Sequence, residues 1–114
     1  MCAEAKSPVL QMEVDRQPEK IIVRCTGRVN LDSWTLFSKT VRDLFAEQKP
    51  IRVDLSNVTL VDSTGIGAFV SVWASAKGSG SDLKFCNPNK RVQDVVEITR
   101  LHGMFENFPT GAGA

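Results

Sequence analysis

The chain has 114 residues, of which 42% are apolar and 24% charged, and its formal net charge is +1. This length suits one domain with its own hydrophobic core, and the balanced charge argues against binding to nucleic acid or to anionic membranes. Three widely spaced cysteines without a Cys-x-x-Cys pair, and a single histidine, argue against a disulfide framework or a zinc site.

Strand and helix patterns alternate along the chain. In chain order, apolar periodicity predicts strands over residues 9–14 and 20–26, a helix over 30–48, a strand over 51–55, a helix over 63–78, a strand over 83–86 and a helix over 90–99. The polar turn between the first two strands predicts a hairpin. Pro50 ends the first helix, Asp32 or Ser33 caps its start, and Asn89 is the expected N-cap of the last helix.

The element order is therefore β-β-α-β-α-β-α, which is typical of an α/β domain. We expect one domain over residues 9–108, with a mixed β-sheet of four or five strands packed with three or four helices. Strands connected by helices should pair in parallel. Residues 101–108 are expected to add a helical turn and an edge strand, whereas residues 1–8 and 109–114 are expected to be flexible tails.

The helix that follows Asp62 has no charged residue before Lys77. At about 100° per residue, its large apolar residues fall on one arc, which is the expected core face: Ile66, Phe69, Val70 and Trp73. The opposite arc has only small uncharged residues: Thr64, Gly67, Ala68, Ser71, Ala74, Ser75 and Gly78. Because exposed helix faces normally carry charges, this arc either packs tightly on another helix of the chain or binds a partner.

Ser63 is expected at the start of this helix, next to Asp62. A phosphate on Ser63 would add a charge of about −1.5 to −2 beside the carboxylate and at the edge of an uncharged face. Two unit charges at about 4 Å interact by roughly 4 kcal/mol near a protein surface, and a third of that energy changes affinity about tenfold. We therefore predict that phosphorylation of the Ser63 hydroxyl would switch off binding to a partner.

Catalysis by the same serine has weaker support. The segment Val61-Asp62-Ser63-Thr64-Gly65 lacks the first glycine of the nucleophile motif G-x-S-x-G, and an esterase would need His102 as its base. Gly65-Ile66-Gly67 also lacks the third glycine of a dinucleotide-binding loop. No apolar run reaches the roughly 18 to 20 residues of a membrane span. We expect a cytoplasmic protein that is not an enzyme and that has no catalytic residue, metal or cofactor.

Two segments of the chain form a recognisable pattern, namely Val53-Asp54-Leu55-Ser56-Asn57-Val58 and Val61-Asp62-Ser63-Thr64-Gly65-Ile66-Gly67. This pattern resembles the STAS family, the fold of bacterial anti-sigma factor antagonists. The resemblance implies an antagonist that binds an anti-sigma factor with serine kinase activity and thereby releases a sigma factor. It also implies inactivation by phosphorylation of Ser63, with Thr64 as the neighbouring alternative, and reversal by a phosphatase.

The implied partner-binding residues are Asn30, Asp62, Ser63, Thr64, Gly65, Gly67, Ala68, Ser71 and Ser75. Two positions depart from the family pattern. Asn30 replaces an acidic residue after the second strand, and Arg100 replaces a glycine that ends the last helix, so we expect Gly103 to provide that cap later. The alternative function is a STAS module of a sensory scaffold or of a membrane transporter, in which Ser63 is only an N-cap.

Overall fold

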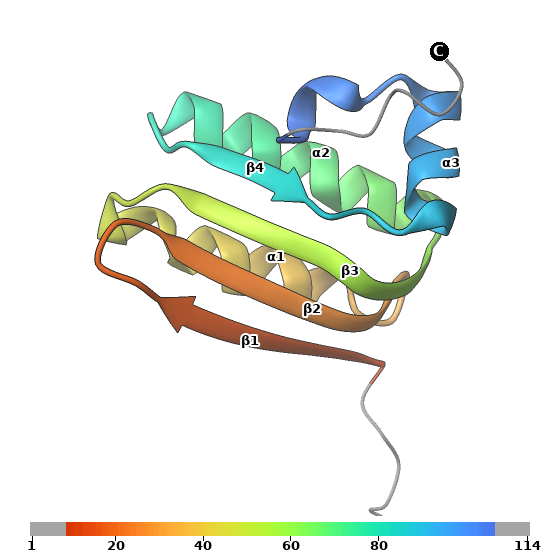
Figure 1. Ribbon diagram of the computed structural model, residues 1–114, viewed down its shortest axis with the longest axis horizontal. Coiled ribbons are helices and arrows are strands. Elements are labelled where there is room, and N and C mark those ends of the chain that lie inside the picture. Colours follow the sequence, from red (N-terminus) through yellow and green to blue (C-terminus); the bar gives the residue numbers. More distant parts are fainter. Residues whose placement is uncertain (1–8, 107–114) are drawn as a thin grey trace, which may run out of the picture.

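Four strands lie side by side in the order in which they occur along the chain. The computed structural model describes residues 9–106, and its strands are β1 (Leu10–Arg16), β2 (Ile21–Val29), β3 (Ile51–Val61) and β4 (Leu83–Cys86) (Figure 1). Strands β1 and β2 form the expected antiparallel hairpin, whereas β2 pairs in parallel with β3 and β3 with β4. The mixed sheet with parallel pairs is confirmed.

Three α-helices connect and cover these strands. They are α1 (Trp34–Asp43), α2 (Ser63–Gly78) and α3 (Lys90–Thr99), and two short 3-10 turns follow α1 and α3, namely η2 (Phe45–Glu47) and η3 (His102–Met104). Figure 1 shows α1 and α2 behind the sheet, with α3 near the end of β3. After η3, Phe105 forms a single parallel bridge with Phe85. The predicted order β-β-α-β-α-β-α and the α/β class are therefore confirmed, and the expected edge strand is reduced to this bridge.

Aromatic rings hold the helices to the sheet. The ring centroid of Phe69 in α2 lies 5.1 Å from that of Phe37 in α1 and 4.8 Å from that of Phe85 in β4. All three side chains are fully buried. Phe105 extends the cluster, with its centroid 5.6 Å from that of Phe85. Tilted pairs at these distances have favourable ring geometry, so one cluster connects both covering helices to the last strand.

Two elements have other boundaries than predicted. The helix predicted over residues 30–48 starts later, because the carbonyl of Asn30 accepts hydrogen bonds from Ser33 and Trp34 in a turn before α1. It also ends earlier, at Asp43 rather than just before Pro50, because the chain continues as the 3-10 turn η2 and a left-handed Gln48. Strand β3 continues six residues beyond the predicted end at Leu55. Its apolar alternation is broken there by irregular pairing with β2, whose register shifts near Gly27. A period-two pattern does not detect a strand that contains such a bulge.

The end of α3 also differs from the prediction. The helix ends at Thr99, and Arg100 adopts the left-handed conformation with φ 58°. Gly103 was expected to supply this cap, but it lies inside η3. A left-handed residue that is not glycine costs roughly 1 kcal/mol. The chain accepts this conformation because it must turn back directly after α3 to place Phe105 beside Phe85.

Helix α2 is rotated relative to the predicted arcs. Its buried residues are Gly65, Ala68, Phe69, Val72 and Ala76. Val70, which was assigned to the core face, is 36% exposed, whereas Ala68, which was assigned to the outer arc, is 4% exposed. Trp73 is only partly buried, and the ammonium of Lys77 lies 4.6 Å from its ring centroid. Small residues face the core because they allow α2 to approach the sheet and α1 closely.

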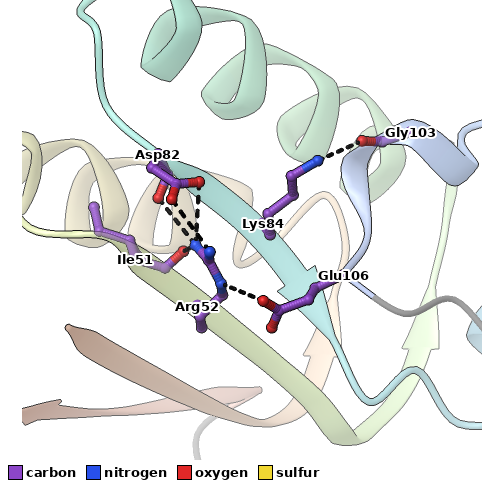
Figure 2. Close-up of polar contacts among 6 residues, drawn as sticks. All are labelled: Ile51, Arg52, Asp82, Lys84, Gly103 and Glu106. Atoms are coloured by element: carbon purple, nitrogen blue, oxygen red, sulfur yellow. Dashed lines mark hydrogen bonds and ion pairs between the residues drawn. The ribbon is translucent and has the colours of Figure 1, made fainter. Parts of the chain in front are cut away.

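The face of the sheet opposite α1 and α2 carries an ion-pair network at its β4 edge (Figure 2). Arg52 donates to the carboxylate of Asp82 at 3.2 Å and forms an ion pair with Glu106 at 3.2 Å. Lys84 donates to the carbonyl of Gly103 at 3.3 Å. These contacts tie the segment after α3 to the sheet. The expected tails, residues 1–8 and 109–114, lie outside the described residues, as do the last two residues of the expected domain.

Candidate functional site

Parallel pairing of β2 and β3 brings two predicted site residues together. Val29 and Val61 are register partners at the carboxyl ends of these strands. Asn30 and Asp62 follow them directly, so both lie at the same edge of the sheet. The backbone N–H of Asp62 donates to the carbonyl of Val29 at 3.4 Å. The carboxyl ends of neighbouring parallel strands are the usual position of binding sites in α/β proteins.

Asp62 is the N-cap of α2. Its backbone is extended, with φ −95° and ψ −173°, and its Oδ1 accepts the N–H of Gly65 at 2.8 Å. Ser63 is therefore the first residue of the helix, and the interpretation of Ser63 as the N-cap is wrong. The Ser63 side chain is exposed, and within residues 9–106 it has no hydrogen-bond partner. The Ser63 hydroxyl is therefore accessible from solvent.

Gly65 allows the first turn of α2 to pack closely against the sheet. A Cβ atom at this position would lie 2.1 Å from the carbonyl oxygen of Val29 and 2.9 Å from Cγ1 of Val61. No side chain other than hydrogen fits there. Gly65 was predicted to bind a partner, yet it is buried. Its contribution is indirect: because Gly65 has no side chain, the start of α2, which includes Ser63, can lie close to the end of β2.

Asn30 builds the turn that leads into α1. Its Oδ1 accepts the N–H of Asp32 at 2.9 Å, and its own N–H donates to Oγ of Ser33 at 3.0 Å. Ser33, the residue before α1, donates in turn to the carbonyl of Arg28 at 2.7 Å. This is the local hydrogen bonding that makes Asn and Asp common in turns. The turn presents Leu31, which is 69% exposed.

From Ser63 to Ala74 the exposed residues of α2 are uncharged, and exposed apolar side chains occur in the neighbouring segments. Exposed small residues of α2 include Ser63, Gly67, Ser71 and Ala74. Three large apolar side chains occur in the segments that meet this edge, namely Leu31, Trp34 and Leu60, which are 69%, 39% and 40% exposed. We call these seven residues the docking face. An exposed apolar area without charge is typical of a protein–protein interface.

Sequence reasoning missed the apolar members of the docking face. In the predicted helix over residues 30–48, the spacing of Trp34 from Phe37 and Val41 places it among the expected core residues. Leu31 lies between the polar residues Asn30 and Asp32. A single leucine in a polar turn is the sequence signal that could have identified it as an exposed contact residue. Leu60 was missed because the predicted third strand ended before it.

Two serines of the small arc, Ser71 and Ser75, contact α1 of the same chain. Arg42 of α1 donates from Nη1 to Oγ of Ser75 at 2.6 Å and from Nη2 to Oγ of Ser71 at 2.7 Å. The two interpretations of the arc therefore each apply to a part of it. Around Ser75 and the buried Ala68 it contacts α1, whereas around Ser63 and Gly67 it faces solvent.

The two residues of the esterase alternative lie in different elements. Ser63 begins α2, whereas His102 lies in η3, where its Nε2 is 3.7 Å from the carboxylate of Glu97 in α3. On the opposite sheet face, burial and Asp54 raise the pKa of the Cys86 thiol to about 11. Cys86 is therefore a neutral thiol near pH 7 rather than a nucleophilic thiolate.

Residues 9–106 contain neither a membrane-spanning helix nor a metal-binding cluster. None of the helices in this range is long and apolar enough to cross a membrane. The same range contains no group of three or more His, Cys, Asp or Glu residues that is placed to hold a metal ion.

Two substitutions of Asp62 separate its role as a helix cap from the effect of its negative charge. Asp62→Ala should lower the free energy of unfolding by about 1 kcal/mol, because the N–H of Gly65 loses its acceptor. Asp62→Ser should cost much less, since serine is an equally good N-cap. Urea denaturation of both variants measures the difference. Equal losses in the two variants would show that the carboxylate contributes through something other than capping.

Comparisons with known proteins agree with this architecture. The family model described as "Mlab, STAS domain" matches residues 12–106. The anti-sigma-B factor antagonist of Bacillus subtilis is 26% identical over 97 residues, which cover 85% of this chain and 89% of that protein. Structures also resemble the chain. The unphosphorylated form of the anti-sigma factor antagonist SpoIIAA superposes with a TM-score of 0.69 at 13% identity, covering 84% of this chain and 86% of that one.

Two more likenesses show how widely the fold is used. The phosphorylated form of SpoIIAA from Bacillus superposes with a TM-score of 0.65 at 12% identity, covering 84% of this chain and 89% of that one. Murine solute carrier 26 family member A9, an anion transporter, superposes over 78% of this chain and 15% of its own, with a TM-score of 0.66 at 15% identity. At these identities the structures share the fold alone. The family model, in contrast, spans nearly all described residues, and the chain belongs to the STAS domain family.

Proposed function

We propose that this protein is an anti-sigma factor antagonist controlled by phosphorylation of Ser63. In its unphosphorylated form it binds an anti-sigma factor with serine kinase activity, and the sigma factor is released. The observation that carries the proposal is the position of Ser63. It is the exposed first residue of α2 and a member of the docking face, and its hydroxyl has no hydrogen-bond partner within residues 9–106. Ser63 is thus a substrate, and the protein regulates by binding.

The local electrostatics make phosphorylation of Ser63 inhibitory for binding. Helix N-termini attract anions, but the carboxylate of Asp62 already accepts the N–H of Gly65 at this terminus. A phosphate would add about −1.5 to −2 charges beside that carboxylate. It would also have to lose water when a partner covers the uncharged docking face, which is unfavourable. We expect at least a tenfold loss of affinity.

The relatives support the same role. Proteins similar to this chain over most of their length include the anti-sigma-B factor antagonist of Bacillus subtilis, and the fold is shared with both the unphosphorylated and phosphorylated forms of SpoIIAA. A phosphatase that removes the phosphate from Ser63 would complete the cycle. Since the proposed kinase uses ATP, the proposal places the protein in the cytoplasm.

The test is phosphorylation by an anti-sigma factor kinase encoded in the same genome. The kinase and ATP are incubated with the wild type, Ser63→Ala and Thr64→Ala, and the phosphate is mapped by mass spectrometry. We expect phosphate on Ser63 in the wild type and in Thr64→Ala, and none in Ser63→Ala. Phosphate on Thr64 would move the switch by one residue, and absence from both residues would refute it.

Binding of the same kinase to substituted proteins separates the switch from a constant interface. Ser63→Asp should weaken binding at least tenfold in calorimetry, whereas Ser63→Ala should bind like the wild type. Both variants keep Asp62 as the cap, so the helix start is preserved. A STAS module of a scaffold or a transporter would bind its constant partner equally well in both variants, and this result would favour that alternative.

A further inference from the structure

A groove runs between α1 and α2, and three residues of the docking face, Trp34, Gly67 and Ser71, line it. Its volume is about 340 Å³. Trp34, Ser38 and Arg42 form the wall on α1, and Thr64, Gly67, Ala68 and Ser71 form the wall and floor on α2. We call it the α1–α2 groove. Its two ends differ in chemistry, because an indole ring borders one end and a guanidinium group the other.

The middle of the α1–α2 groove is open because its lining residues are small. Ala68 and Ser38 are buried at 4% and 8% exposure and form its base. A Cβ atom built on Gly67 would meet no atom within 4 Å. Position 67 therefore tolerates a side chain as far as this chain is concerned, and the space above it is free for a side chain of another molecule.

Arg42 supplies an unneutralised positive charge at one end of the groove. Two of its N–H groups are fixed by Ser71 and Ser75 at 2.7 and 2.6 Å. Within residues 9–106 it forms no ion pair, and the nearby Asp43 is paired with Lys39. A guanidinium group has five N–H donors, so donors remain for an incoming group. The complementary group is a carboxylate, which arginine binds with directional hydrogen bonds.

The spacing along the helices defines the shape of the occupant. Helices α1 and α2 follow the parallel strands β2 and β3, and Arg42 near the end of α1 reaches Ser71 and Ser75 in the second half of α2, so the two helices run side by side in the same direction. Ser38 precedes Arg42 by four residues, or about 6 Å along the helix. An apolar side chain near Gly67 and a carboxylate on Arg42 would thus be about one helical turn apart. This is the spacing of positions i and i+3 or i+4 on an amphipathic helix.

We propose that the α1–α2 groove binds an amphipathic helix of the protein partner. The helix inserts one large apolar side chain beside Gly67 and Ala68 and places a carboxylate, three or four residues away, on Arg42. This inference rests on the proposed function, because it describes the partner of the docking face. Arg42 then selects partners by charge, independently of Ser63.

A random peptide library tests this recognition without any kinase. A phage library of 16-residue peptides is selected against the wild type, Arg42→Glu and Gly67→Leu, with Gly78→Leu as the matched control. Gly78 lies in the same helix, outside the groove, and a Cβ there also meets nothing within 4 Å. Thermal unfolding first verifies that each variant is folded.

The wild type and Gly78→Leu should both enrich peptides with a large apolar residue three or four positions from Asp or Glu. Arg42→Glu should enrich Lys or Arg at the acidic position, and Gly67→Leu should reduce recovery at least tenfold. The best peptide, measured by fluorescence polarisation, should bind Arg42→Gln about tenfold more weakly than the wild type, because a hydrogen bond to a charged group is lost.

Three outcomes would overturn the inference. These are an identical consensus for the wild type and Arg42→Glu, undiminished recovery with Gly67→Leu, and no enrichment at all. A concentration-dependent dimer of the wild type that Gly67→Leu abolishes in sedimentation would assign the groove to a second copy of the chain, which also contradicts it. Failure of the kinase assay on Ser63 leaves these readouts unaffected, so the two proposals fail separately.

Discussion

Replacing Gly65 with alanine should lower the free energy of unfolding by about 3 kcal/mol, at the upper end of the usual range for overpacking. The added Cβ would lie 2.1 Å from the carbonyl oxygen of Val29, which belongs to the backbone of β2 and cannot rotate away. Either α2 or the end of β2 must shift. Because Asp62 and Asn30 follow these two strand ends, that shift would also separate the two sides of the candidate site. Urea denaturation monitored by circular dichroism measures the loss.

Gly67→Ala is the matched control for this prediction. It is the same substitution two residues later in the same helix, and the added Cβ meets no atom within 4 Å. Alanine is a better helix former than glycine by up to about 1 kcal/mol, so this variant should be as stable as the wild type or slightly more stable. A similar loss of stability in both variants would show that the close approach at Gly65 is not the cause.

Local sequence signals predicted the elements well where one residue type decides a boundary. The helix start after Asp62 and the N-cap at Asn89 are both confirmed, and the side chain of Asn89 accepts the N–H of Val92 at 3.0 Å. Strand β4 has the predicted bounds. In each case the deciding hydrogen bond or apolar alternation lies within three residues in the sequence, so a local pattern is sufficient.

The orientation of α2 could not be predicted in this way. The sequence assigned the largest apolar residues to the core, including Val70, whereas the structure buries Ala68 and Ala76. What decides the orientation is the distance between packed elements. At Gly65 the carbonyl of Val29, which is 36 residues earlier in the chain, leaves no room for a side chain, so the helix turns its small residues inward. Such long-range contacts are absent from a periodicity argument.

In the candidate site, too, local sequence motifs identified some residues, whereas residues that depend on long-range contacts were missed. Ser63 and Asp62 were recognisable from their order in the sequence, and the resemblance to the STAS family gave them a role. Arg42 was not recognised, because its partners Ser71 and Ser75 are 29 and 33 residues away. In the sequence it is one of several charged residues of the first helix, with Lys39, Asp43 and Glu47. Only the side-by-side arrangement of α1 and α2 makes it part of a groove.

Truncation of Phe69 should be the second strongly destabilising change. Phe69 is fully buried, and its ring centroid lies 5.1 Å from that of Phe37 and 4.8 Å from that of Phe85. Phe69→Ala should lower the free energy of unfolding by about 3–5 kcal/mol, because it leaves a cavity where α1, α2 and β4 meet.

The neighbouring Val70 provides the control for Phe69, because the sequence placed both residues on the core face. Val70 is 36% exposed, so Val70→Ala should cost less than about 1 kcal/mol. Its midpoint in urea should remain close to that of the wild type, whereas that of Phe69→Ala should fall sharply. If Val70→Ala were as destabilising as the usual truncation of a buried valine, about 2 kcal/mol or more, α2 would have the orientation expected from its apolar periodicity. In that orientation Ala68 would return to the surface, and the α1–α2 groove would lose its floor.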